Sequence, residues 1–186
     1  MTRTNATLCH IGLIALMTAG AASSAASQAV TQEDVLDAWD VMTEMVVASA
    51  RAMPAEHFEF SPGEPLRTFA DQLNHTTQSN LGFSQSVNAG APSFAIPDQA
   101  NPPREKAAVI DLLEKSFAHF RLGLTSLTDE DLGAEVPWGP RTNRRMITRL
   151  KAVLIVTSHL QREHGKTIMY LRARGITPPP SGSWSF

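Results

Sequence analysis

The sequence predicts an all-α protein, a four-helix bundle that follows an N-terminal signal peptide. Four segments carry apolar residues at helical spacing, and no segment alternates apolar and polar residues as a half-buried strand would. Four amphipathic helices without a sheet bury their apolar faces against one another, which is the arrangement of a bundle. At 186 residues the chain is long enough for one such domain, which we place at residues 31–179.

The first predicted helix begins at Thr31 and ends near Met53. Thr31 and Asp34 have the spacing of a capping box, in which two side chains satisfy the free backbone N–H groups of a helix start. Pro54 cannot continue the helix, because it has no N–H to donate. Apolar residues recur at helical spacing between these limits: Val35, Leu36, Trp39, Met42, Val46 and Ala50.

A second helix is predicted from about Leu66 to Phe83, after a connecting loop that contains Pro and Gly. Its inward stripe is Leu66, Phe69, Leu73, and His75 or Thr76. A long loop then separates the second and third helices over residues 84–103, which are rich in Asn, Ala, Gly, Ser and Pro. That loop either covers one mouth of the bundle or is a surface excursion.

The third helix is predicted from about Arg104 to Ser126, with a wide buried face. Its apolar positions are Ala108, Ile110, Leu112, Leu113, Phe117, Phe120 and Leu124. A second helix-start signature, Thr128 to Asp131, indicates one short turn before a rigid loop, residues 136–140.

The last helix is expected to start near Thr142 or Asn143 and to continue to Arg174. Gly175 favours the left-handed conformation that ends many helices, and three prolines from Pro178 prevent continuation. Residues 180–186 are expected to form a short tail.

The first 26 residues are typical of a cleaved signal peptide. Arg3 is the positive residue, Cys9 to Met17 form the apolar segment, and small residues follow it. An uncleaved anchor is the alternative, but the apolar run is shorter than the roughly 20 residues of a spanning helix. We therefore expect an exported protein, periplasmic or secreted, with no stable membrane span after cleavage. Cys9 is the only cysteine, so the mature chain would have no thiol for disulfides or catalysis.

Composition excludes several function classes. The formal net charge is −2 at pH 7, and nucleic-acid binding requires a concentrated basic face, so we expect no nucleic-acid partner. The sequence contains neither a phosphate-binding Gly-rich loop nor a nucleophile elbow, and nucleotide hydrolysis and serine-hydrolase chemistry therefore have no support.

Three polar residues are candidate metal ligands. His159 and Glu163 are four residues apart on the last helix, about 40° around its axis, and share one face. If the second helix faces this one, His75 completes a set of two imidazoles and one carboxylate, which leaves coordination positions open for water or substrate. His164 lies about 140° from His159 and points elsewhere on a straight helix. The four-residue spacing of His159 and Glu163 is also that of an ordinary helix-stabilising pair, so spacing alone does not establish a metal site.

Four segments follow one another along the chain: residues 53–58, 66–75 (LRTFADQLNH), 158–165 (SHLQREHG) and 170–179 (YLRARGITPP). In this order they resemble the DinB-like family of metal-binding bundle proteins. The resemblance implies a four-helix bundle, often a homodimer, with a divalent metal held by three histidines. His75 and His159 match the first two ligands, but Glu163 stands where the family has its third histidine. Three alternatives follow: Glu163 ligates, His164 rotates in through a helical bulge, or the site holds no metal.

The resemblance also implies several classes of reaction, but it identifies no substrate. Family members look like thiol-dependent transferases or metal-dependent hydrolases and isomerases. Export favours hydrolysis of an unknown small molecule, because low-molecular-weight thiols are kept reduced mainly in the cytosol. The ion could be zinc, nickel, iron or manganese. A non-catalytic bundle that binds a small molecule or a protein partner is the alternative function.

Two further groups of residues could serve this site. Tyr170 lies two turns beyond Glu163 and either donates a proton or only packs at the end of the bundle with its hydroxyl in water. Trp138 and the arginines Arg141, Arg144 and Arg145 either border a pocket or form a solvated helix start.

Overall fold

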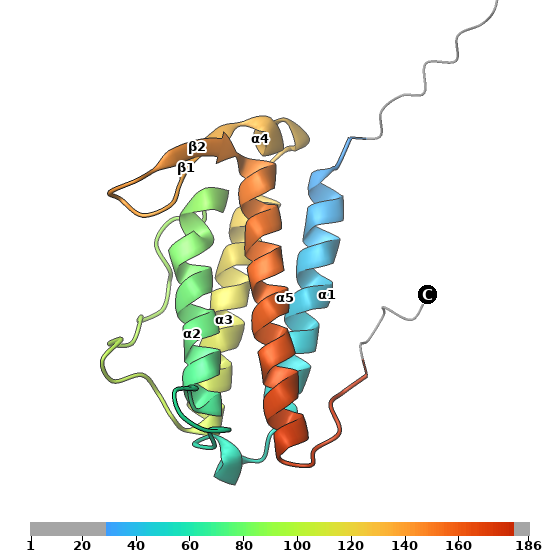
Figure 1. Cartoon of the computed structure of the whole chain (residues 1–186). Coiled ribbons are helices and arrows are strands. Elements are labelled where there is room, and N and C mark those ends of the chain that lie inside the picture. The colour runs from blue at the N-terminus through green and yellow to red at the C-terminus, as the bar shows by residue number, and fades with distance from the viewer. Residues whose placement is uncertain (1–28, 181–186) are drawn as a thin grey trace, which may run out of the picture.

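The computed structural model describes residues 29–180, and in this range four long helices pack side by side as a bundle (Figure 1). They are α1 (Gln32–Ala52), α2 (Phe69–Phe83), α3 (Lys106–Thr125) and α5 (Arg149–Ala173). The all-α four-helix bundle is therefore confirmed. The expected signal peptide, residues 1–26, lies outside the described residues, as does the tail beyond residue 180. Within the described range, no helix is both long enough and apolar enough to cross a membrane.

Local side-chain hydrogen bonds set where the helices begin. Thr31 accepts a hydrogen bond from the backbone N–H of Asp34 (3.1 Å), and the Asp34 carboxylate accepts one from the N–H of Thr31 (2.8 Å). This is the expected capping box. The predicted start of α2 at Leu66 is wrong, because Thr68 caps the helix by accepting from the N–H of Asp71 (3.1 Å). Leu66 consequently lies outside the helix and is 55% exposed.

Aromatic side chains from α1 and α3 form the centre of the core. The Trp39 ring stacks on Phe120 with centroids 4.3 Å apart and meets the edge of Phe117 at 5.9 Å. Trp39 and Phe120 are almost completely buried. The predicted buried face of α3 is correct in most positions, but Ala108 is exposed and its neighbour Val109 is buried instead.

A short β-hairpin occupies the segment that was expected to be a loop and the start of the last helix. Strand β1 (Glu135–Trp138) pairs with β2 (Arg145–Thr148) in antiparallel register, from Glu135 opposite Thr148 to Trp138 opposite Arg145. The expectation of no strand is therefore wrong, and α5 begins at Arg149 instead of near residue 142. Each strand has four residues and a proline interrupts β1, so the alternation is too short to be recognised in sequence.

Arg149 connects two short helices at the hairpin end of the bundle. It is only 6% exposed, and its guanidinium donates to the backbone carbonyl of Ser86 (3.1 Å) and to that of Asp131 (2.9 Å). Ser86 lies in the short helix η2 (Ser84–Val87), and Asp131 lies in α4 (Asp129–Gly133), the short turn that the sequence predicted. The hairpin and α4 thus lie across one end of the four helices (Figure 1).

The long segment between α2 and α3 begins with η2 at the hairpin end and then runs along the outside of the bundle (Figure 1). Residues 96–98 lie beside the side chains of Asn74 and Leu112, which belong to α2 and α3. At the end of the loop, the Asn74 amide donates to the carbonyl of Pro103 (2.7 Å). The loop therefore follows the α2–α3 side and leaves the α2–α5 side to the polar residues described next (Figure 1).

Candidate metal centre

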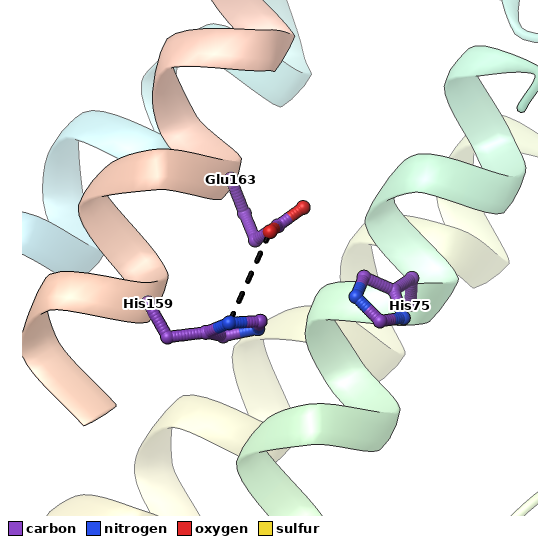
Figure 2. A group of neighbouring side chains, drawn as sticks. All are labelled: His75, His159 and Glu163. Carbon is purple, nitrogen blue, oxygen red and sulfur yellow. Dashed lines mark ion pairs between the residues drawn. The ribbon is translucent and has the colours of Figure 1, made fainter. Parts of the chain in front are cut away.

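Three polar side chains meet between α2 and α5, near the middle of both helices (Figure 2). His75 comes from α2, and His159 and Glu163 come from successive turns of α5. One nitrogen or carboxylate oxygen from each lies within 4.8 Å of the others. The imidazole centroids of His75 and His159 are 5.7 Å apart. The structure therefore brings together the three residues that the sequence singled out.

Glu163 is the most buried of the three, with a side chain only 1% exposed. Lys166 donates to both of its carboxylate oxygens (2.9 and 2.7 Å), Gln72 donates at 2.5 Å and Arg162 at 3.1 Å. Burial alone would raise the pKa of this carboxyl, but the hydrogen bonds from Lys166 and Gln72 outweigh it and lower the pKa to about 2. Glu163 is therefore an anion throughout the physiological pH range.

His159 has one satisfied and one unsatisfied ring nitrogen. Its Nδ1 lies 2.7 Å from the guanidinium of Arg162, which can only donate, so the neutral ring carries its proton on Nε2. Nε2 is buried and has no hydrogen-bond partner within residues 29–180. Burial also lowers the pKa of His159, which keeps the ring neutral at pH 7.

His75 is held neutral by its surroundings in the same way. Burial is the first cause of its lowered pKa, and the positive charge of Arg67 is the second. A neutral imidazole is the form that binds a metal, because a protonated ring has no free lone pair.

This set of donors fits a divalent cation. Metal–ligand bonds of about 2.1 Å place the ligand atoms of one ion about 3.4 Å apart at tetrahedral angles, so small side-chain rotations would close the present spacing. Lys166 and Arg162 would have to leave the carboxylate and the imidazole. Both can do so, since their side chains are 42% and 65% exposed. Two imidazoles and one carboxylate would leave open positions on the ion.

His164 faces a different side of α5. Its Nε2 lies 3.1 Å from the hydroxyl of Ser49 on α1, on the far side of the helix from His75. The helix α5 is continuous from Arg149 to Ala173, so the structure contains no bulge that would turn His164 toward His159. Glu163 therefore occupies the third position of the cluster, as the helical geometry predicted.

Tyr170 is buried, so the alternative in which its hydroxyl lies in water is wrong. It is 5% exposed, and its hydroxyl donates to the backbone carbonyl of Arg67 (2.6 Å). Burial raises its pKa above the ordinary value. The phenol proton thus forms a hydrogen bond to the backbone, and this bond holds the segment before α2 against the last turns of α5.

The residues around Glu163 were not foreseen from the sequence. Gln72 precedes His75 by three residues on α2, and Lys166 follows Glu163 by three on α5. Residues three apart lie on one helical face, so the same reasoning that selected the ligands could have found both.

The hairpin forms a wall beside His159. Phe83 at the end of α2 stacks on Trp138 with centroids 5.2 Å apart, and its ring edge meets His159 at 5.6 Å. Trp138, Phe83 and Arg144 line a cavity of about 400 Å³, whereas Arg141 and Arg145 do not border it. Of the three arginines that were predicted either to border a pocket or to form a solvated helix start, only Arg144 lines this cavity.

Comparisons with known proteins agree with this architecture. Two solved structures are similar: a DinB-like protein from Bacillus cereus (16% identity, TM-score 0.68, covering 81% of this chain and 97% of that one) and a DinB-like protein from Bacillus subtilis (17%, TM-score 0.62, 78% and 94%). A search of curated proteins gives no significant match. The sequence model of the DinB superfamily matches residues 38–168, which include α2 and most of α5 with all three clustered side chains. This match over most of the chain shows that the protein belongs to the DinB superfamily.

Proposed function

We propose that the protein binds one divalent metal ion through His75, His159 and Glu163 and uses it in the hydrolysis of a small molecule. The observation that carries this proposal is the convergence of two neutral imidazoles and one carboxylate, with ligand atoms within 4.8 Å. The Nδ1 lone pair of His159 adds to it, because its present partner, the exposed Arg162 guanidinium, can leave it to a cation.

A bound divalent cation would supply Lewis-acid chemistry, polarising a carbonyl or phosphoryl group and making water more acidic. The chain's own residues would orient and surround it. Glu163 would hold the ion with an anionic oxygen that Gln72 keeps in place by hydrogen bonding. Lys166 and Arg162, once released from the ligands, would place two positive charges beside negative charge that develops on a substrate.

Metal content per chain tests the proposal directly. Untagged protein purified without chelator should contain close to one equivalent of zinc, nickel, iron or manganese by elemental analysis. His159→Ala should lose it, whereas His57→Ala should keep it, because the His57 ring lies at another place, 3.2 Å from Arg174. Wild-type protein that neither contains metal nor takes up any of the four ions would disprove the metal function.

A second candidate function is a non-catalytic bundle in which the polar cluster is structural. The hydrogen bonds from Lys166, Gln72 and Arg162 favour it, since they already satisfy the Glu163 carboxylate without an ion. Thermal unfolding with and without chelator separates the two candidates. A metal centre predicts a lower Tm after chelation, and a purely structural cluster predicts no change.

We also propose that the protein is exported and forms a homodimer. Export follows from the signal-peptide pattern of residues 1–26, and the mass of the protein isolated from the periplasm or medium would test it. Loss of about 26 residues is expected, and an intact N-terminus would contradict cleavage. Light scattering after size exclusion should give twice the mass of one chain.

A further inference from the structure

A second cavity, of about 570 Å³, lies beside the metal centre on the side away from the hairpin. It is formed by the segment just before α2 and by the last turns of α5. Gln72 and Lys166 belong both to its wall and to the hydrogen bonds around Glu163. Gln72 and Lys166 therefore connect the wall of the cavity to the Glu163 carboxylate, which does not itself line the cavity.

The outer wall of the cavity is apolar and exposed. Leu66 is 55% exposed and Met169 is 61% exposed, and both line the same cavity with Tyr170. Apolar side chains grouped around a concave surface are typical of a binding site for an apolar group. The volume is in the range of cavities that hold small ligands.

The inner wall carries two positive charges. Lys166 is bound to Glu163, but its side chain remains 42% exposed. The exposed Arg67 guanidinium makes no hydrogen bond or ion pair with any residue between 29 and 180. The nearest acidic group on α2, Asp71, already lies 3.4 Å from Arg104. Arg67 thus offers an unused, planar set of donors to an anion in the cavity.

From this arrangement we propose that the cavity binds a small-molecule carboxylate with an apolar body. The carboxylate would lie between Arg67 and Lys166, and the apolar body would lie on Leu66 and Met169. Charge-assisted hydrogen bonds to the first pair fix orientation, and burial of the body supplies affinity. The coupling of this ligand to a bound cation rests on the proposed metal function; the cavity itself does not depend on it.

Lys166 links the two sites. In the present structure its ammonium compensates the charge of Glu163. When a cation binds Glu163, the ammonium is released and lies at the wall of the cavity, free to bind the carboxylate. The two ligands therefore strengthen each other's binding, because each favours the same position of one side chain.

Calorimetric titration of the purified protein with octanoate tests the inference, with octan-1-ol as a neutral comparator of the same chain length. Octanoate should bind and octan-1-ol should bind at least about tenfold more weakly, the value of one charged hydrogen bond. Arg67→Met should lower the affinity for octanoate by about tenfold, and Arg67→Lys should recover part of this lost affinity. Arg144→Met, in the hairpin cavity, is the matched control and should bind octanoate like wild type.

Equal binding of acid and alcohol, no binding of octanoate, or an unchanged affinity in Arg67→Met would each overturn the inference. Titrations of zinc-loaded and chelated protein separate it from the metal function. If the protein takes up metal but does not bind octanoate, only the proposed cavity site is contradicted. If it binds octanoate through Arg67 but takes up no metal, only the proposed metal function is contradicted. Tighter octanoate binding after zinc loading supports the role of Lys166, and equal affinity contradicts it.

Discussion

The ammonium of Lys166 lies 2.7 and 2.9 Å from the two carboxylate oxygens of Glu163, a side chain that is 1% exposed. A buried carboxylate needs a cation or several hydrogen bonds, since its desolvation is costly. Lys166 provides that charge from within the chain. An ion that uses Glu163 as a ligand must therefore displace Lys166, and this competition sets the affinity of the centre.

Replacing Lys166 by methionine should increase the affinity for zinc. The substitution removes both the competing donor and the repulsion between ammonium and cation, and we expect a gain of about tenfold or more, the value of a charged hydrogen bond. Competition with a chelating dye measures it. Lys151→Met, at an exposed position near the start of the same helix, is the control and should leave zinc affinity unchanged. A weaker affinity in Lys166→Met would mean that Lys166 supports the ion instead of competing with it.

The stability of the chelated protein should fall in acid because of Glu163. Its folded-state pKa of about 2 is below the ordinary 4.5, so its contribution is complete above pH 4.5 and is lost as the pH falls toward 2. The shift corresponds to at most about 3 kcal/mol of unfolding free energy. Urea unfolding at pH 6 and pH 3 measures the change. In Glu163→Gln the decrease over this interval should be smaller, and an equal decrease in both proteins would show that other groups dominate.

The stacked pair of Trp39 and Phe120 should dominate the stability of the α1–α3 interface. Phe120→Ala is expected to cost about 3–5 kcal/mol, because it leaves a cavity beside a fully buried indole. Leu122→Ala on the same helix removes an apolar side chain that is 66% exposed, and it should change stability by less than about 0.5 kcal/mol. Urea denaturation of both variants tests the contrast, which similar losses would contradict.

Two helical glycines should respond in opposite directions to replacement by alanine. A Cβ at Gly123 would lie 2.7 Å from both the Cγ2 and the carbonyl oxygen of Val87, so Gly123→Ala forces α3 and η2 apart at a cost of about 1–3 kcal/mol. A Cβ at Gly165 meets nothing within 4 Å, and Gly165→Ala should raise stability by about 0.5–1 kcal/mol. Thermal unfolding distinguishes them, and a loss of stability in Gly165→Ala would show that this position needs its glycine.

Helix spacing and capping chemistry predicted most of the fold. The apolar positions of α1 and the Thr31–Asp34 cap are local features, so they can be read from neighbouring residues. The hairpin could not be recognised, because each of its strands has only four residues and a proline interrupts β1. For the same reason the start of α5 was placed too early.

The relative positions of candidate ligands could be predicted where the residues belong to the same helix. The turn of α5 puts His159 and Glu163 on one face and His164 on another, and His75 meets them because α2 and α5 are neighbours. The partners of Glu163 and the burial of Tyr170 depend on how two helices approach each other. The hydrogen bond of Tyr170 could not be foreseen, because its acceptor is a backbone carbonyl 103 residues away.

Glu163, the proposed third ligand, lies within an unbroken helix, so its side chain can change while the backbone of α5 stays the same. Replacing Glu163 by histidine would present an imidazole from the same turn without changing the backbone. Carboxylates suit manganese and other hard ions, and imidazoles suit zinc and nickel. With a metal bound at this cluster, the metal preference would depend on this one side chain, and a single amino-acid change would alter it while the bundle stayed as it is.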